Sequence, residues 1–211
     1  MHQLSKTIKS YDKQADWHSN KFDGYDLTDY QLKFIKLLKG RKILDFGCGN
    51  GRDLEFFYKK EFEVIGIDYS DALIKKARSR INNVKVLKMD FLKKLDFKGE
   101  EFDGVWASAS LIHVPKKSLN KVLSELKRIM KPKGVLFVSV KEGAEEKFVK
   151  DDFGNEKRFF SFFDKKELMD ILNKMGFKTI ESHIISDEKL RVGFMKKKTP
   201  QNWIMLYSIK T

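Results

Sequence analysis

Short, mainly apolar runs alternate along the chain with stretches whose apolar residues recur every three or four positions. The apolar runs predict strands at 43–46, 62–67, 84–87, 102–108, 135–140, 177–186 and 203–210. The helical spacing predicts helices at 52–60, 70–80, 118–130 and 164–175. Strands that alternate with helices indicate a parallel α/β sheet. The last two strands are joined by a loop alone, so we expect a seven-stranded, mostly parallel sheet flanked by helices, with an antiparallel last strand.

The first 40 residues precede this alternation and predict two further helices, at about 7–19 and 27–38. Asp26 or Thr28 is placed to cap the second helix, and Gly40 to end it. Aromatic side chains gather between the two helices. No linker rich in Ser, Gly or Pro interrupts the chain, so we expect one domain, 1–211, with a helical extension at 1–40 and a core at 41–211.

The amino-acid composition indicates the compartment and the kinds of ligand more clearly than the reaction. No apolar run approaches the ~20 residues of a membrane span, and the first ten residues lack the apolar core of a signal peptide, so a cytoplasmic protein is expected. The only cysteine, Cys48, allows neither an internal disulfide nor a cysteine-based zinc site, and no metal is expected. The net charge of +13 raises the possibility of nucleic-acid binding. However, 36 of the 43 basic residues are lysines spread over the whole chain, not clustered arginines.

A glycine-rich turn, Asp45-x-Gly47-x-Gly49-x-Gly51, follows the first predicted strand and leads into a helix. Glycines allow a sharp turn and a close approach of a ligand to the backbone, and a helix start offers unpaired N–H groups. The spacing is not the G-x-G-x-x-G of dinucleotide sites. An acidic residue beside the turn would repel a pyrophosphate but suits a ligand that carries an ammonium group. A plain strand–helix turn without a ligand is the alternative.

Acidic residues also follow the next two strands. Asp68 ends the second strand, 19 positions after Gly49, which is the place where a carboxylate accepts hydrogen bonds from a ribose diol. Asp90 and Phe91 come just after the third strand. The carboxyl ends of parallel strands lie at one edge of the sheet, where open α/β sheets bind ligands.

Together these segments resemble the class I S-adenosylmethionine (SAM) methyltransferases over about Arg41–Lys210. Four motifs occur in the family's order, LDFGCGNG, GIDYS, MDF and FDGVWASASLIHVP. The resemblance implies a Rossmann-like core with SAM as cofactor, its methionine end at the glycine turn, its ribose at Asp68 and its adenine at Asp90 and Phe91. The implied cofactor-binding residues are Asp45, Gly47, Cys48, Gly49, Arg52, Asp68, Tyr69, Asp90, Phe91, Ala107 and Ser108. It also implies that the N-terminal extension is a lid; a helix pair packed on the sheet edge is the alternative.

The sequence gives less indication of the residues that would contact the methyl acceptor. His113 is a candidate general base, although in the resembling family this position commonly supports the loop. Tyr11 and Trp17 of the extension are candidate substrate contacts, as are Arg158, for an acidic substrate group, and Phe160. The four phenylalanines at 159, 160, 162 and 163 cannot all face one side of a strand, so some should pack in the core. We expect a hairpin turn at Asp152–Asn155 and a solvated loop at Lys189–Lys198.

The function expected from these features is methyl transfer from SAM to a small molecule by in-line displacement, leaving S-adenosylhomocysteine. Two alternatives stay open: an RNA methyltransferase, favoured by the charge, and a SAM- or nucleotide-binding module without catalysis. No N-P-P-Y-like motif and no cysteine pair support base methylation. The sequence predicts neither the acceptor nor the oligomeric state.

Overall fold

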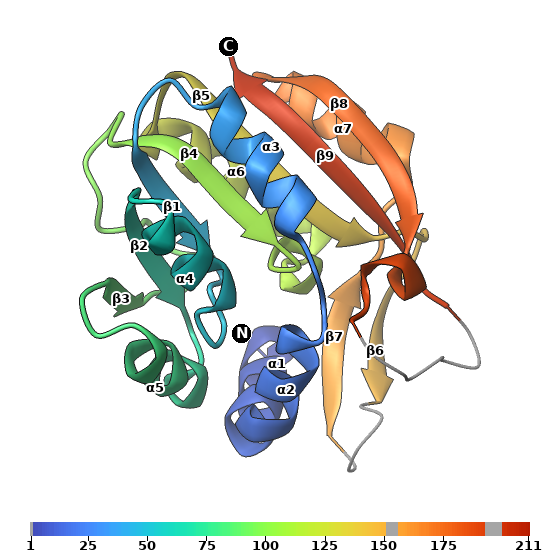
Figure 1. Cartoon of the computed structure of the whole chain (residues 1–211). Coiled ribbons are helices and arrows are strands. Elements are labelled where there is room, and N and C mark those ends of the chain that lie inside the picture. Colours follow the sequence, from blue (N-terminus) through green and yellow to red (C-terminus); the bar gives the residue numbers. More distant parts are fainter. Residues whose placement is uncertain (1, 151–155, 193–199) are drawn as a thin grey trace.

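A seven-stranded sheet runs through the centre of the molecule (Figure 1). The computed structural model describes residues 2–150, 156–192 and 200–211. Across the sheet the strands are β3 (Lys85–Lys88), β2 (Glu63–Asp68), β1 (Lys42–Phe46), β4 (Phe102–Ser108), β5 (Met130–Lys141), β9 (Asn202–Lys210) and β8 (Phe177–Ser186). The first five pair in parallel, whereas β9 pairs antiparallel with both β5 and β8. The predicted sheet, with its antiparallel last strand, is confirmed.

Helices cover both faces of this sheet. One face packs against α3 (Thr28–Leu37), α4 (Arg52–Lys59) and α5 (Asp71–Arg80), and the other against α6 (Lys116–Ile129) and α7 (Lys165–Lys174). Successive residues of β1 alternate between the two cores, Ile43 on the first and Leu44 on the second. Because both faces are buried, the central strands have continuous apolar runs. No helix within the described residues is long and apolar enough to cross a membrane.

The N-terminal extension contains three helices instead of the predicted two. The helix expected at 7–19 is broken at Gln14 into α1 (His2–Lys13) and α2 (Ala15–Asp23). The aromatic residues expected between two helices therefore lie mostly on α2. Helices α1 and α2 lie apart from α3, below the strand ends in Figure 1. There α1 packs against α5 and against a β-hairpin.

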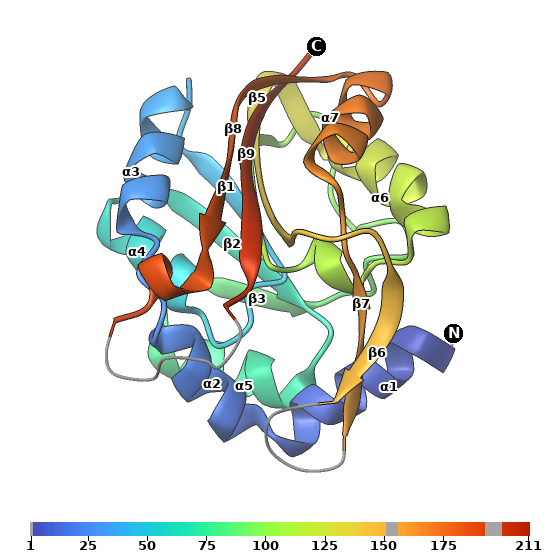
Figure 2. The same cartoon turned by 90° about the vertical axis from the view of Figure 1, so that its right-hand side faces the viewer.

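That hairpin consists of β6 (Glu146–Lys150) and β7 (Lys157–Ser161), and neither strand is among those predicted from the sequence. Figure 2 shows it extending beyond the main sheet beside α1. The predicted turn at Asp152–Asn155 lies outside the described residues. All four phenylalanines of the 159–163 segment are buried, because α1 and the core cover opposite sides of β7; the backbone N–H of Phe159 donates to Thr7 Oγ1 of α1 at 2.9 Å.

Several predicted boundaries hold, whereas others differ in the structure. The helices predicted at 70–80 and 164–175 are present as α5 and α7, and their first predicted residues, Ser70 and Asp164, are the N-caps. The helix predicted from Ser118 begins two residues earlier, at Lys116, directly after Pro115, whose ring fixes a backbone angle suited to a helix start.

Residues 131–134, between the predicted helix at 118–130 and the predicted strand at 135–140, lie inside β5, as an irregularity where the pairing with β4 shifts register. The start of the expected loop at Lys189–Lys198 is ordered as well, since a 3₁₀ helix, η2, spans Asp187–Leu190, and Arg191 forms a β-bridge with Tyr25. Residues 193–198 of that loop lie outside the described residues.

Candidate functional site

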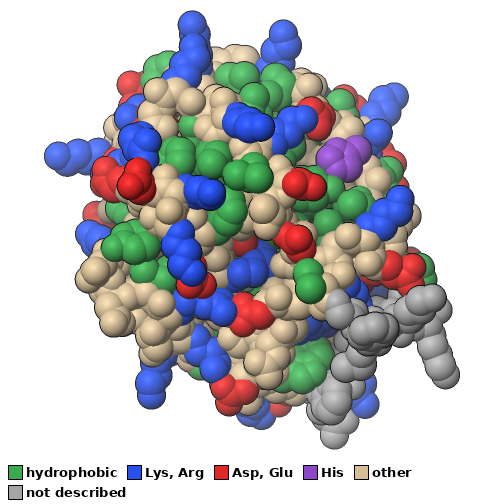
Figure 3. Space-filling model, in the orientation of Figure 1, with side chains coloured by type: hydrophobic (Ala, Val, Ile, Leu, Met, Phe, Trp, Pro, Cys, Tyr) green, Lys and Arg blue, Asp and Glu red, His purple; other side chains and the backbone are tan. Residues whose placement is uncertain are grey.

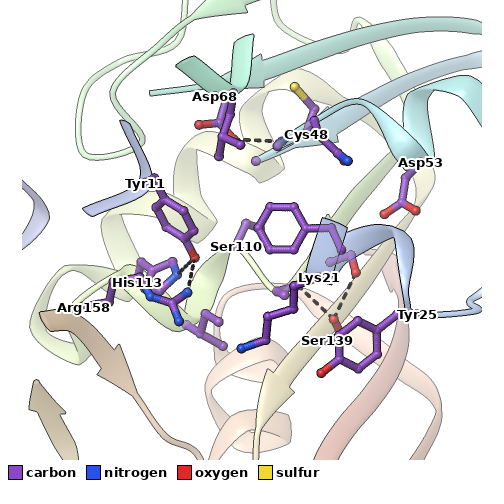
Figure 4. A pocket seen from close by; sticks show the side chains of 18 of the residues that line it. Tyr11, Lys21, Tyr25, Cys48, Asp53, Asp68, Ser110, His113, Ser139 and Arg158 are labelled. Atoms are coloured by element: carbon purple, nitrogen blue, oxygen red, sulfur yellow. Dashed lines mark hydrogen bonds between the residues drawn. The ribbon is translucent and has the colours of Figure 1, made fainter. Parts of the chain in front are cut away.

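A large pocket opens at the carboxyl ends of β1, β2, β4 and β5 (Figure 4). Helices α1 and α2 and strand β7 contribute its other walls, through residues such as Tyr11, Phe22 and Phe160. The empty space, including its open mouth, is about 1380 Å³. The strand-end residues predicted from sequence meet the N-terminal extension here.

The glycine turn forms the pocket wall nearest β1. Gly47 has φ 81°, a backbone conformation that side-chain-bearing residues rarely adopt. A Cβ atom at Gly47 would lie 2.5 Å from Cβ of Ser110, so the site also lacks room for one. The turn is tied to β2, because the N–H groups of Gly47 and Cys48 both donate to the Ile67 carbonyl at 2.9 Å.

The Asp68 carboxylate links this turn to the end of β2. Its Oδ2 accepts from the backbone N–H of Gly49 at 2.9 Å, and its Oδ1 accepts from Tyr69 and Ser70 at 2.7 and 2.9 Å. Burial raises the pKa of Asp68, although these three bonds act in the opposite direction. Asp68 lines the pocket and also organises the loop.

A partly buried ion pair lies beside the turn. Arg52 donates to both carboxylate oxygens of Asp53, at 2.8 and 2.9 Å, and to the Phe22 carbonyl at 2.6 Å. Asp53 also accepts from Trp106 Nε1 and Gln31 Nε2, both at 2.8 Å. Arg52 lines the pocket, yet much of its guanidinium is bound within the protein. Sequence reasoning missed Asp53 as its partner, although it directly follows Arg52 at a helix start.

Two polar atoms near the turn are buried without a hydrogen-bond partner among the described residues. They are Asp45 Oδ2 and Ser110 Oγ. Burial raises the pKa of Asp45 well above its usual value, and the nearby Asp53 acts in the same direction. Cys48 lines the pocket, and burial raises the pKa of its thiol. A thiol that stays protonated is a poor nucleophile, which favours its interpretation as a small loop residue.

Four of the sequence-predicted site residues do not line the pocket: Asp45, Asp90, Ala107 and Trp17. Asp90 accepts from the backbone N–H of Leu92 at 2.9 Å. Ala107 is fully buried in β4. Trp17 packs against His18 and lies under the Lys21 ammonium, 4.6 Å from its ring centre.

The remaining predicted residues do line the pocket. Tyr11, His113 and Arg158 converge from three different elements, α1, η1 (Leu111–His113) and β7 (Figure 4). His113 Nδ1 lies 2.6 Å from the Phe159 carbonyl, and Nε2 lies 2.7 Å from the Tyr11 hydroxyl. Arg158 Nη1 donates to the same hydroxyl at 2.9 Å. The sequence suggested each residue singly, without indicating this contact.

The protonation of His113 follows from its surroundings. Burial, together with the positive charges of Arg158 and Lys141, lowers the pKa of His113 to about 3. The ring is therefore neutral near pH 7. A carbonyl can only accept, so Nδ1 carries the proton and donates to Phe159. Nε2 then accepts from the Tyr11 O–H, whose oxygen accepts from Arg158.

Further lining residues come from the ends of β5 and β9 and from η2, segments that the motifs did not mark. They are Ser139, Lys141, Asp187, Leu190, Gln201, Trp203 and Met205. For Ser139 and Lys141 the sequence offers one indication, because both lie near the carboxyl end of the fifth parallel strand. Ser139 Oγ accepts from the Ala109 backbone N–H at 2.9 Å.

Sequence comparisons agree with this arrangement. A family model described as a methyltransferase domain matches residues 43–134. Phosphoethanolamine N-methyltransferase of Plasmodium falciparum is 25% identical over 169 residues, 78% of this chain and 64% of the relative. 24-Methylenesterol C-methyltransferase 3 of Arabidopsis thaliana is 35% identical over 130 residues, 57% of this chain and 34% of the relative. The chain thus spans less than two thirds of either relative.

Solved structures share the fold. 1,6-Didemethyltoxoflavin-N1-methyltransferase of Burkholderia thailandensis, with bound 1,6-didemethyltoxoflavin and S-adenosylhomocysteine, superposes with a TM-score of 0.77 at 18% identity, over 98% of this chain and 88% of that one. A SAM-dependent methyltransferase of Methanosarcina mazei gives 0.73 at 19% identity, over 88% and 98%. With the strand order, the four strand-end motifs and the matching domain family, the chain belongs to the class I SAM-dependent methyltransferases.

Proposed function

We propose that this protein transfers a methyl group from SAM to a small-molecule acceptor. The observation that carries the proposal is the division of one pocket into two halves. The glycine turn and Asp68 form one half, and Tyr11, His113 and Arg158 form the other. The names of relatives that act on phosphoethanolamine and on a sterol support a small acceptor.

The first half fits SAM. Asp68 lines the pocket with a carboxylate fixed by three N–H bonds, placed to accept from a ribose diol. The turn at Gly47 brings bare backbone to the pocket. Asp45, next to the turn, has a buried Oδ2 without a hydrogen-bond partner among the described residues, although Asp45 itself does not line the pocket. The Phe91 ring, whose centre lies 4.2 Å from that of the Phe46 ring, offers a flat apolar wall for adenine. When bound, SAM supplies an activated methyl group on a sulfonium.

In the second half we assign positioning as the main contribution of the protein. His113 is a poor proton acceptor, because its pKa is about 3 and its accepting nitrogen is occupied by Tyr11. His113 therefore acts by orienting the Tyr11 hydroxyl, which we place against the acceptor, and not as the general base considered from sequence. Alignment of two reactants in a site without water accounts for much of the rate enhancement in such displacements.

We further propose that α1 and α2 act as a lid. They supply Tyr11, Lys21 and Phe22 to the pocket wall, and their contacts with the rest of the chain include the bond from Ser70 Oγ to Asp12 Oδ1 at 2.6 Å. A covered site suits a small acceptor better than RNA. On the face in Figure 3, Lys and Arg side chains are scattered among acidic and apolar ones. The cytoplasm stays the proposed compartment.

Incubation with SAM labelled in its methyl group tests the proposal. The protein is offered a low-molecular-mass metabolite extract and, separately, bulk RNA. We expect label in the small-molecule fraction. Label that enters RNA in a salt-sensitive manner would replace the proposed acceptor class. SAM binding without turnover in any pool would favour a binding module.

A further inference from the structure

Helix α2 is attached at its carboxyl end to the glycine turn and to the helix that follows the turn. Asn50 Nδ2, from the turn, donates to Ser19 Oγ at 2.8 Å and to Asp23 Oδ1 at 3.0 Å. Arg52 Nη1, from the start of α4, donates to the Phe22 carbonyl at 2.6 Å, which is one of the carbonyls that a helix leaves unpaired at its end. The turn that we propose to hold the cofactor is therefore also an attachment point of the proposed lid.

The Asn50 side chain connects the two elements in a buried place. Asn50 is 3% exposed. Its amide oxygen accepts from the Arg52 backbone N–H at 3.3 Å, on the side of the turn, while its amide nitrogen donates to α2. Burial raises the pKa of Asp23, but hydrogen bonds from Arg80 and Asn50 outweigh this effect, so that the pKa lies below its usual value. Asp23 is therefore ionised near pH 7, and the bond from Asn50 is charge-assisted.

Gly49, the residue before Asn50, allows α2 to approach the turn closely. A Cβ atom at Gly49 would lie 3.3 Å from Cε2 of Phe22, so the Phe22 ring rests against bare backbone. Gly49 and Phe22 both line the pocket. A ligand that fixes the backbone of the turn therefore also fixes the surface against which α2 packs.

Two further contacts of α2 lie nearer to the solvent. Asp16 pairs with Lys76 of α5 at 2.5 Å, but the Asp16 side chain is 93% exposed. Asp23 pairs with Arg80 at 2.8 Å, and both side chains are partly exposed. Ion pairs in contact with water contribute little to stability, whereas a buried polar group that loses its partner is costly. Of these contacts, the one at Asn50 should therefore hold α2 most firmly.

From this geometry we infer that Asn50 is a positioning residue that couples cofactor binding to closure of the lid. A cofactor that orders the glycine turn holds the Asn50 amide in the orientation that α2 requires. The closed α2 in turn places Lys21 and Phe22 in the pocket wall. Coupling between two such events is reciprocal, so the closed lid also retains the cofactor. The inference rests on the proposed cofactor site and lid, and it specifies the side chain that connects them.

Asn50→Asp tests the two ends of this side chain separately. The carboxylate keeps an oxygen for the Arg52 N–H, but it removes the donors to α2 and places a negative charge against Asp23. Hydrogen exchange of the α2 amides, followed by mass spectrometry with and without saturating S-adenosylhomocysteine, measures lid closure. We expect the ligand to slow this exchange about tenfold or more in the wild type, the equivalent of one charge-assisted bond, and less than about threefold in Asn50→Asp. Equal slowing in the two proteins would overturn the inference.

Changes on the lid side distinguish coupling from simple damage to the turn. Adding Asp23→Asn to Asn50→Asp removes the facing charge and supplies an amide donor from α2, so part of the slowing should return. A turn that is merely distorted would not be repaired by a change in α2, and the absence of any recovery would contradict the assigned contact. The matched control is Asn120→Asp, because Asn120 is exposed on α6 and does not line the pocket.

Calorimetry with S-adenosylhomocysteine, measured first on every protein, separates this inference from the proposed function. Absence of binding in the wild type contradicts the proposed function itself. Binding to the wild type without slower exchange in α2 contradicts only the coupling. If Asn50→Asp fails to bind, Asp23→Ala removes the same bond from the lid side and leaves the turn intact. Wild-type slowing of exchange in Asp23→Ala would then overturn the inference.

Discussion

Replacement of Asp68 perturbs the cofactor half of the pocket most directly. Asp68→Ala removes the acceptor proposed for both ribose hydroxyls, and each charge-assisted bond contributes about 1.5–3 kcal/mol. Because such losses are rarely additive, we expect a loss of about 2–4 kcal/mol, or ~30- to 1000-fold weaker binding of S-adenosylhomocysteine. Asp68→Asn should cost less, since the amide retains one accepting oxygen.

The same substitution should also reduce stability, because three backbone N–H groups lose their acceptor. We expect about 1–3 kcal/mol, which a domain of ordinary stability tolerates. Calorimetric titration measures the affinity, and urea unfolding without ligand measures the stability. Asp96→Ala is the control, since Asp96 is exposed and does not line the pocket. Folded Asp68→Ala protein that binds with wild-type affinity would refute the ribose assignment.

Three further predictions concern single residues. Gly47→Ala should lower stability by about 1–3 kcal/mol and weaken cofactor-product binding, because its φ is 81° and its Cβ would meet Ser110. Gly99→Ala is the control in the same thermal and calorimetric assays, because its Cβ would make only an ordinary contact with the Arg128 carbonyl oxygen at 3.6 Å. Tyr11→Phe should reduce label transfer at least tenfold while changing S-adenosylhomocysteine affinity little, and an equal loss in both would contradict a role on the acceptor side. Burial keeps the pKa of His113 at about 3, whereas an unfolded histidine titrates near ~6.5, so the folded state binds fewer protons and loses stability as pH falls below ~6.5. Urea unfolding measures the free energy of unfolding at pH 7 and at pH 5. Its decrease between these pH values should be smaller by about 2 kcal/mol in His113→Gln than in the wild type. Identical decreases in the two proteins would contradict a buried neutral ring.

The strand-end motifs could be predicted from sequence because they are local. Asp45, Gly47 and Asp68 belong to segments whose apolar runs and glycines fix strand and turn without information from elsewhere. The contact of Tyr11 with His113 and Arg158 could not be predicted in the same way. It joins residues 102 and 147 positions apart, and their meeting depends on how α1 packs against β7.

The N-terminal helices illustrate a second limit. The spacing of apolar residues fits one helix across 7–19, yet the chain breaks at Gln14 so that α1 and α2 can both cover the pocket. Tertiary packing overrides such weak local preferences. Strand β6 was missed for a related reason, since its residues are largely exposed and carry no buried apolar run.

The structure of the protein crystallised with S-adenosylhomocysteine tests the central claim most directly. The account predicts the two ribose hydroxyls within hydrogen-bond distance of the Asp68 carboxylate and the amino-acid end at the Gly47–Gly49 turn. It also predicts that the sulfur faces the half formed by Tyr11, Arg158 and Phe160. A ligand bound elsewhere, or one whose ribose turns away from Asp68, would contradict it.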